Sequence, residues 1–155
     1  MISQTAEYAL RAMVFLAEEG EPRTIQQIAG VTRVPSGYLS KVMQGMARQG
    51  LVRSQRGLGG GFALAVPPEK LTIYDIVQAV DPVQRITHCP LNLPAHQREL
   101  CPLHRRLDDA ARLTEESFRA SRLADLIRGG EPTFGPGVAP LPMATALPEG
   151  EDRKP

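Results

Sequence analysis

Both cysteines and all three histidines of this chain fall within one short segment. These residues are His88, Cys89, His96, Cys101 and His104. Thiolate and imidazole groups bind zinc in tetrahedral sites, although the eleven residues between Cys89 and Cys101 are not a standard zinc spacing. The two thiols would alternatively form a disulfide when oxidised, or act as small buried residues beside surface histidines. The residue types alone leave these three alternatives open.

His104 follows Cys101 by three residues, at the predicted start of a long helix. Residues three apart lie on the same helical face, so the two side chains would meet if the helix has begun by Cys101. An isolated histidine on a helix is usually a surface group. The Cys-x-x-His spacing is what makes His104 a candidate ligand.

The positive charge of the chain is confined to one region of the sequence. The whole sequence is nearly neutral, with 18 Lys and Arg against 17 Asp and Glu. Between Pro22 and Pro68, however, no acidic residue occurs, and the basic residues there are Arg23, Arg33, Lys41, Arg48, Arg53 and Arg56. Because a surface of one sign neutralises phosphates, this stretch predicts binding to a polyanion.

Three helices and a hairpin are predicted to position this basic stretch. Apolar spacing, capping residues and stop signals predict helices over Ser3–Glu19, 24–29 and Pro35–Arg48. Two β-like runs follow, Leu51–Gln55 and Phe62–Val66, joined by a glycine-rich turn. This order predicts a mostly α fold with a small β-hairpin wing, the winged helix-turn-helix, followed by a long helix.

In a winged helix-turn-helix, the second helix of the motif enters the major groove of DNA, and here that helix is Pro35–Arg48. Arg56, at the base of the wing, is placed to enter a minor groove. The residues predicted to contact DNA are Thr24, Pro35, Ser36, Gly37, Tyr38, Ser40, Lys41, Gln44, Arg48, Ser54, Arg56, Gly59 and Gly60. A basic helix face is usually only a solvated surface, and it is the combination with this helix order that favours DNA binding. No Gly-Lys-Ser/Thr follows the glycines, so a P-loop is excluded.

The chain divides into four predicted segments. Residues 1–82 form the DNA-binding domain, 83–101 the cysteine and histidine loop, 102–128 the long helix region and 129–155 a proline-rich disordered tail. One face of the long helix is lined by Leu103, Leu107, Ala110, Ala111, Thr114 and Phe118. No apolar run has the length of a membrane span and no signal peptide is recognisable, so we expect a cytoplasmic protein with no membrane partner. With no nucleophile–base pair or cofactor cradle, we expect no enzymatic activity.

Five stretches of the chain have the pattern of one regulator family. They are Tyr8-Ala9-Leu10-Arg11-Ala12-Met13, Gly37-Tyr38-Leu39, Gly50-Leu51-Val52, Arg56-Gly57-Leu58-Gly59-Gly60-Gly61-Phe62-Ala63-Leu64 and Ile76-Val77-Gln78-Ala79-Val80-Asp81. They resemble the winged-helix regulators that include the iron–sulfur cluster assembly regulator (IscR), the nitric-oxide-sensing repressor (NsrR) and the cysteine-metabolism regulator (CymR). The resemblance covers about residues 1–128. It implies a homodimer, paired through the long helix, that binds a pseudo-palindromic operator in double-stranded DNA, most often as a repressor.

Sensors of this family bind an iron–sulfur cluster through three cysteines, spaced C-x5-C-x5-C, in the loop before the dimer helix. Cys89 and Cys101 match the outer pair, and Ala95 stands at the middle position. Cys101 and His104 match the family's Cys-x-x-His arrangement, and Glu7 lies where the nitric-oxide sensor has an acidic ligand. The resemblance therefore implies a cluster, 2Fe–2S in type, with zinc or no cofactor as alternatives. Its implied ligands are Cys89, Cys101, His104 and either the partner subunit's Glu7 or His96.

The expected function is a homodimeric transcriptional repressor that senses iron–sulfur, redox or nitrosative status through this Cys/His site. The alternative is a regulator of the same fold without a cofactor, controlled by a thiol switch or by a protein partner. Both expected functions require DNA binding. They differ in whether the cysteine and histidine loop holds a cofactor.

Overall fold

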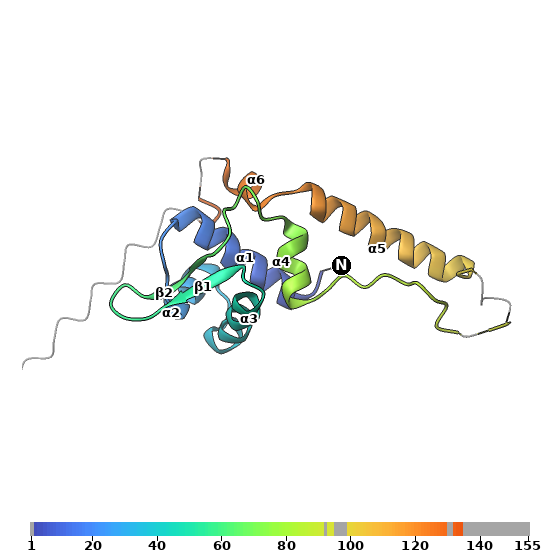
Figure 1. Ribbon diagram of the computed structural model, residues 1–155, viewed down its shortest axis with the longest axis horizontal. Helices are drawn as coiled ribbons and strands as arrows, with labels where there is room; N and C mark the ends of the chain where they lie inside the picture. Colours follow the sequence, from blue (N-terminus) through green and yellow to red (C-terminus); the bar gives the residue numbers. More distant parts are fainter. Residues whose placement is uncertain (1, 92, 95–98, 130–131, 135–155) are drawn as a thin grey trace, which may run out of the picture.

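The computed structural model describes residues 2–91, 93–94, 99–129 and 132–134. Its elements follow the order α1 (Gln4–Glu19), α2 (Ile25–Thr32), α3 (Ser36–Arg48), β1 (Val52–Gln55), β2 (Gly61–Leu64), α4 (Ile73–Val80), α5 (Pro102–Ala120) and α6 (Leu123–Ile127) (Figure 1). The mostly helical winged-helix order with a two-stranded antiparallel hairpin, expected from the sequence, is confirmed. Among the described residues, no helix is both long and apolar enough to cross a bilayer.

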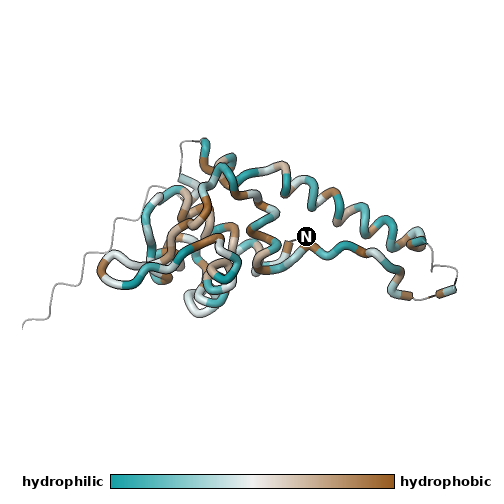
Figure 2. The backbone as a smooth tube through the Cα atoms, in the orientation of Figure 1, coloured by the Kyte–Doolittle hydropathy of each residue, from teal (hydrophilic) through white to brown (hydrophobic). Residues whose placement is uncertain are grey.

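Helix α1 is the centre of the core. Ser3 caps its start by accepting a hydrogen bond from the Ala6 amide at 3.2 Å, and Gly20 ends it in the left-handed conformation. Ala6, Ala9 and Ala12 are fully buried, so neighbouring helices approach α1 closely. Helices α2, α3, α4 and α6 all contact it. Figure 2 shows the hydrophobic segments gathered around this helix.

Helix α2 continues to Thr32, three residues beyond its predicted end at residue 29. Thr24 and Gln27 form the predicted capping box at its start. Ile28 and Thr32 are both buried one turn apart, and the Thr32 hydroxyl donates to the Ile28 carbonyl at 2.7 Å. Burial of this turn outweighs the helix-breaking tendency of Gly30, which is about 1 kcal/mol. The turn of the helix-turn-helix is made by Arg33 in the left-handed conformation instead.

The wing consists of β1, β2 and the residues that join them. The antiparallel register pairs Val52 with Leu64 at the base of the wing. Arg23 adds one more bridge to Phe62, with N–O distances of 2.9 and 2.8 Å. Only glycine fits at Gly61, because its φ is 147° and a Cβ there would lie 2.3 Å from the Arg23 carbonyl oxygen. The wing is therefore fixed to the segment that precedes α2.

The described residues between 82 and 120, here called the arm, project from the rest of the described chain, here called the winged-helix unit (Figure 1). An extended segment, residues 82–89, runs out beside α5, and α5 returns toward the winged-helix unit. Helix α5 has 19 residues, none of them buried. Helix α6, which the sequence did not predict, packs on α1 with Leu123 fully buried. Its five residues are too few to give a helical period.

The predicted tail, residues 129–155, lies mostly outside the described residues. Within the described part, the Thr133 amide donates to the Glu18 carboxylate at 2.7 Å. Phe134 packs edge to face on Phe15, with ring centroids 6.5 Å apart. These contacts hold residues 133–134 against the end of α1.

Candidate metal site and DNA interface

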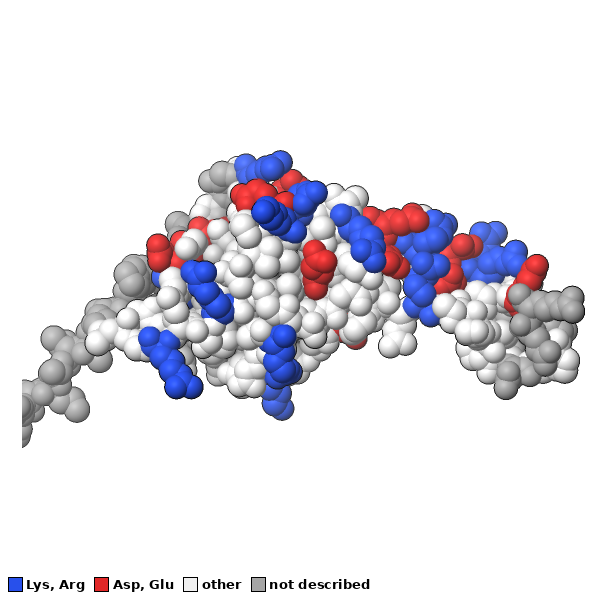
Figure 3. All heavy atoms as spheres, in the orientation of Figure 1, with Lys and Arg blue, Asp and Glu red and all other residues white. Residues whose placement is uncertain are grey.

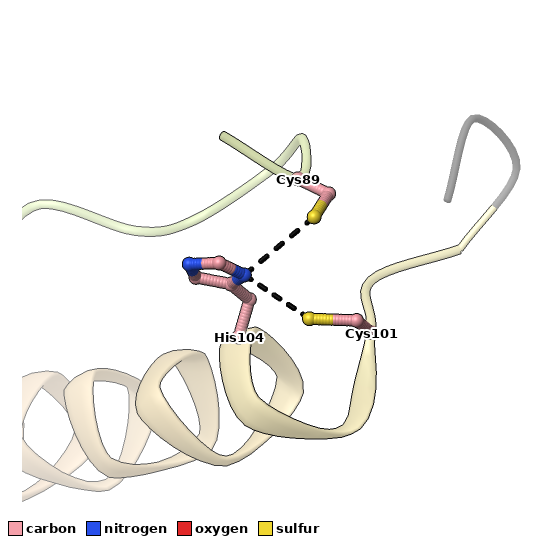
Figure 4. A group of neighbouring side chains, drawn as sticks. All are labelled: Cys89, Cys101 and His104. Carbon is pink, nitrogen blue, oxygen red and sulfur yellow. Dashed lines mark hydrogen bonds between the residues drawn. The ribbon is translucent and has the colours of Figure 1, made fainter. Parts of the chain in front are cut away.

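Three donor side chains meet at the end of the arm that is remote from the winged-helix unit (Figures 1 and 4). The Nδ1 atom of His104 lies 3.1 Å from the Cys101 sulfur and 3.5 Å from the Cys89 sulfur. The three donor atoms all lie within 4.8 Å of one another, and both cysteines are buried. One imidazole nitrogen therefore faces two thiols, as Figure 4 shows.

The first turn of α5 places two of the three donors. Cys101 is the N-cap residue, Pro102 follows at the first helical position, and the Cys101 carbonyl accepts from the Arg105 amide at 2.9 Å. His104 then faces the Cys101 sulfur, which confirms the predicted shared face. Cys89 comes from a segment that is neither helix nor strand. The group therefore forms only because α5 returns beside the extended segment (Figure 1).

The donor geometry fits a single bound ion. Around a tetrahedral zinc, with bonds of about 2.3 Å to sulfur and about 2.0 Å to nitrogen, a sulfur and a nitrogen lie about 3.5 Å apart. The sulfur–nitrogen separations of 3.1 and 3.5 Å are close to this value. Two thiolates and an imidazole are also donors that a 2Fe–2S centre accepts. The fourth ligand position must be filled from outside this group.

The other candidate ligands do not join the three donors. Glu7, on α1, forms an ion pair with Arg11. The His88 Nδ1 atom lies 2.9 Å from the Thr87 hydroxyl. His96, the alternative fourth ligand, lies outside the described residues. Within the described part of one chain, the gathered donors are those of Cys89, Cys101 and His104.

A polar network joins the extended segment to α5 next to this site. Arg85 donates two hydrogen bonds of 2.7 Å, one to each oxygen of Asp108, and the Ile86 amide donates to Asp108 at 2.9 Å. The Arg85 guanidinium, with the Ile86 amide, lowers the pKa of Asp108 to about 2. The same hydrogen bonds to Asp108 raise the pKa of Arg85. Glu115 extends the network, because it lies 2.8 Å from Arg119 and 3.6 Å from Arg85.

The sequence analysis missed this network, although part of its signal is present. His104, Asp108 and Glu115 are spaced by four and seven residues, which places them on one face of a helix. Arg85 has no comparable signal, because it lies 23 residues from Asp108 in the sequence. Only the return of the chain brings the two side chains together.

The residues predicted to contact DNA lie at the start of α2, on α3 and on the wing. The exposed ones are Thr24, Pro35, Ser36, Gly37, Tyr38, Lys41, Gln44, Arg48, Ser54, Arg56 and Gly59, and the half-buried ones are Ser40 and Gly60. The predicted apolar stripe of α3 is buried, as shown by Leu39, Val42, Met43 and Met46. Helix α3 therefore presents its polar side to solvent.

Helix α3 has an N-terminus without a side-chain cap, and its Tyr38 contacts α1. Pro35, its N-cap residue, makes no side-chain hydrogen bond to the first turn, and the first amides of a helix have no partner within it. Tyr38 packs edge to face on Tyr8, with ring centroids 5.6 Å apart, and its hydroxyl bonds the Thr5 hydroxyl. The Tyr38 side chain is therefore positioned by α1 and is still 40% exposed.

In the part of the chain that the structure describes, most side chains of the basic stretch form no ion pair. Glu19, on α1, pairs with Arg23 at 2.5 Å. Within the described part of the chain, no ion pair involves Arg33, Lys41, Arg48, Arg53 or Arg56. Figure 3 shows the contrast: over α3 and the wing the charged side chains in view are Lys and Arg, whereas α5 carries both signs. The charge segregation seen in the sequence is thus a property of the surface.

The tip of the wing presents an apolar side chain that the sequence analysis did not single out. Leu58 is 94% exposed. A tight turn holds it, in which the Gly60 amide donates to the Gly57 carbonyl at 2.9 Å and Gly59 has a φ of 76°. The signal available in the sequence was a lone leucine between glycines, next to Arg56.

Comparisons with known proteins agree with this geometry. The Rrf2 family model, described as an iron-dependent transcriptional regulator, matches residues 2–129. An HTH-type transcriptional regulator of Aquifex aeolicus (strain VF5) is 31% identical over 132 residues, which cover 82% of this chain and 91% of that protein.

Two solved structures are similar over most of their length. CymR (YrzC), the global cysteine regulator of B. subtilis, has a TM-score of 0.68 and 25% identity, covering 82% of this chain and 95% of that one. The IscR of T. potens has a TM-score of 0.69 and 22% identity, covering 84% of this chain and 88% of that one.

The family match spans the winged-helix unit and the arm together, so the resemblance inferred from the wing and α4 motifs is confirmed. This chain belongs to the Rrf2 family and is a DNA-binding transcriptional regulator, not an enzyme.

Proposed function

We propose that this regulator is a homodimeric repressor that reads operator DNA with α3 and the wing. It senses iron–sulfur, redox or nitrosative status through Cys89, Cys101 and His104. The observation that carries the sensing role is the convergence of three metal-binding donor atoms within 4.8 Å. Because this group lies on the arm, away from α3 and the wing (Figure 1), occupancy of the site acts on DNA through the position of the arm.

Helix α3 and the wing have separate tasks at the DNA. Lys41 and Gln44 are exposed on α3 and have the length to reach bases or phosphates in a major groove. The open start of α3 favours a phosphate. On the wing, Arg56 enters an adjoining minor groove and Leu58 lies against its apolar walls. Contacts of different chemistry are thus divided between α3 and the wing.

The surface of α5 supports pairing with a second copy of the chain. Leu103, Leu107 and Leu113 are 62%, 50% and 58% exposed, and no residue of the helix is buried. A groove of about 340 Å³, lined in part by Leu107, Ala110 and Val77, lies between α5, α1 and the end of α4. An apolar face of this kind is stable when another surface covers it. Pairing two arms also gives the two recognition helices the two-fold symmetry of a palindromic operator.

The donor types, two thiolates and an imidazole, suit an iron–sulfur cluster as well as a single ion. When bound, a 2Fe–2S centre with nitrogen ligation on one iron supplies a redox-active group with a raised potential. The family description as iron-dependent supports iron over zinc. Cys89, Cys101 and His104 would hold the cluster. The fourth donor is the partner subunit's Glu7, released from Arg11, or His96.

Operator binding tests the DNA interface. On a duplex selected from random sequences, Arg56→Ala should weaken binding and reduce the slope of log affinity against log salt by about one. Arg112→Ala, which removes an α5 arginine outside the interface, is the control and should leave both quantities unchanged. An unchanged affinity for Arg56→Ala would remove Arg56 from the interface.

Anaerobic purification, followed by absorbance spectroscopy and analysis of iron, sulfide and zinc, tests the site. Broad bands between about 300 and 500 nm, with matched iron and sulfide, are expected for a cysteinyl cluster. Cys101→Ala should lose these bands and keep the fold. Zinc alone would argue for a structural site. A metal-free dimer that still binds DNA would reject the cluster and leave a thiol switch or a protein partner as the control.

A thiol switch is the second candidate, because the two sulfurs lie within 4.8 Å of each other. Oxidation would join the sulfurs of Cys89 and Cys101, with two electrons and two protons passing to an oxidant such as hydrogen peroxide. Peptide mass spectrometry without reductant, after peroxide treatment of metal-free protein, distinguishes this candidate. A cross-linked peptide pair two hydrogens lighter supports the switch, and unlinked peptides reject it.

A further inference from the structure

The three donors of the Cys/His site are not positioned in the same way. Cys101 and His104 are neighbours on the first turn of α5, so the helix itself sets their relation. Cys89 belongs to an extended segment, and the residues on either side of it, His88 and Pro90, are exposed. The extended backbone of this segment does not by itself set the distance of 3.5 Å between the Cys89 sulfur and His104.

A strong attachment of that segment, four residues before Cys89, is the pair Arg85–Asp108. Both guanidinium–carboxylate bonds measure 2.7 Å, and the Ile86 amide donates to the same carboxylate. A bidentate arginine–carboxylate pair fixes the relative orientation of the two side chains as well as their separation. The Asp108 side chain is only 17% exposed, so water competes for it less than for a typical surface carboxylate. This pair joins the extended segment to α5, the two parts of the chain that form the arm.

The Arg85–Asp108 pair and the Cys/His site are separated by the same number of residues on both segments. Arg85 precedes Cys89 by four residues on the extended segment, and Asp108 follows His104 by four residues on α5. Since residues four apart share a helical face, Asp108 and His104 both point at the extended segment, one turn apart. Arg85 contacts the first, and Cys89 contacts the second.

We propose that the Arg85–Asp108 pair, here called the clamp, positions Cys89 against Cys101 and His104 and thereby completes the three-donor site. This inference deepens the proposed function and rests on it, since it concerns the same site. In it, Arg85 and Asp108 are positioning residues that never touch the bound metal. Removing the clamp loosens the position of Cys89 and leaves the relation between Cys101 and His104 intact.

The clamp also connects the site to the winged-helix unit. Glu115, 3.6 Å from Arg85, binds Arg119 at 2.8 Å, and the Arg119 guanidinium lies 3.5 Å from the ring centroid of Tyr74 on α4. Polar contacts therefore run without interruption from the clamp to α4. A change in the position of Cys89 that strains the clamp has a direct route to the helix that packs on α1 and α3.

Alkylation of the two thiols in metal-free protein tests the clamp without any cofactor. In Asp108→Asn, the rate of Cys89 alkylation should rise by about fivefold to tenfold, the effect of losing a charged hydrogen bond at a partly exposed site. The rate for Cys101 should stay within about twofold, because α5 still holds it. Arg85→Lys keeps the positive charge but loses the bidentate hydrogen bonds, so it should give a smaller rise in alkylation rate, confined to Cys89. Peptide mass spectrometry resolves the two cysteines.

Cobalt(II) binding, followed by absorbance, provides the second readout. Asp108→Asn should weaken cobalt affinity by about 10-fold to 100-fold, the usual effect of removing a group that orients a ligand. Glu116→Gln, which breaks an exposed α5 pair with Arg112, is the matched control and should change neither the affinity nor the alkylation rates.

Three results would overturn the clamp. The first is an unchanged Cys89 rate in both clamp variants. The second is an equal rise at Cys89 and Cys101, which would mean that the start of α5 itself has loosened. The third is the same effect in Glu116→Gln. If wild-type protein binds no metal while Cys89 alone is exposed in Asp108→Asn, the clamp stands and the metal-sensing function fails.

Discussion

The winged-helix unit and the arm are built on different physical principles. In the unit, Met13, Leu39 and Met43 are fully buried, and four helices close around α1. In the arm, α5 has no buried residue, and the extended segment is joined to it by the clamp and by the contact of the Cys89 sulfur with the His104 imidazole. Apolar burial therefore fixes the winged-helix unit. Among its described residues, the arm packs apolar side chains against the buried core only at its base, through Val83 and Phe118, and is otherwise held by polar contacts and the Cys/His group.

This difference suits the proposed sensing role. A core held by apolar burial is stable whether or not a ligand is present. An arm held by a few polar contacts is expected to move when one of those contacts is lost, because segments with few buried apolar contacts open locally at a low free-energy cost. The predictions that follow separate these two behaviours.

The largest effect is expected for a core substitution. Met43→Ala, at a fully buried position, should reduce the free energy of unfolding by about 2–5 kcal/mol, because it removes buried apolar volume from the unit. Leu113→Ala, at a position that is 58% exposed on α5, should change it by less than about 0.5 kcal/mol in a monomer. Urea denaturation measures both. Equal losses would show that the arm shares the core of the unit.

The next effect concerns pairing through the arm. Leu107→Glu places a charge on the exposed apolar face of α5 and should weaken the dimer by at least about tenfold, since a charge would be desolvated on pairing. Sedimentation analysis gives the dissociation constant. Leu58→Glu, at a wing residue that is more exposed still, is the control and should leave the dimer intact. Dimers of normal strength in Leu107→Glu would mean that α5 is not the interface.

A pair of glycine substitutions tests the geometry of the unit. Gly61→Ala should lower stability by about 1–3 kcal/mol, because the position has a positive φ and its new Cβ would clash with the Arg23 carbonyl. Gly30→Ala lies inside α2 with no atom near the added Cβ, so it should raise stability by up to about 1 kcal/mol. Thermal unfolding shows whether each substitution lowers or raises the stability. Stabilisation by Gly61→Ala would contradict the wing geometry.

The smallest effect is a titration in the clamp. The pKa of Asp108 is lowered from 3.8 to about 2 by Arg85 and the Ile86 amide, with a smaller contribution from Arg112. A carboxylate whose pKa is depressed on folding stabilises the fold above its unfolded pKa, and this contribution is lost as pH falls through the folded pKa. The chemical shift of the Ile86 amide should therefore titrate near pH 2. A midpoint near 3.8 would show that the clamp does not form.

The sequence predicted the unit well because its signals are local. The apolar spacing of α3, the capping box at Thr24 and the glycines of the wing each lie within a few residues of the structure they specify. The end of α2 was missed because burial of Thr32 outweighed Gly30. Cys101 and His104 were predicted together for the same local reason, one turn of α5.

The arm was predicted less fully because its contacts join distant residues. The clamp links positions 23 residues apart, and the contact of Cys89 with His104 spans 15. No local pattern specifies such a return of the chain. Helix α6 was missed for a different reason, because five residues are too few to show a period.

The most direct test of the account compares operator affinity in protein purified without oxygen and in the same protein after removal of its metal by a chelator. A gel shift on a selected duplex should show a change of about 5-fold to 150-fold, the usual range for coupling between two sites. Cys101→Ala should bind the duplex with one affinity under both conditions. Identical affinities for loaded and emptied wild-type protein would contradict the proposal that the Cys/His site controls DNA binding.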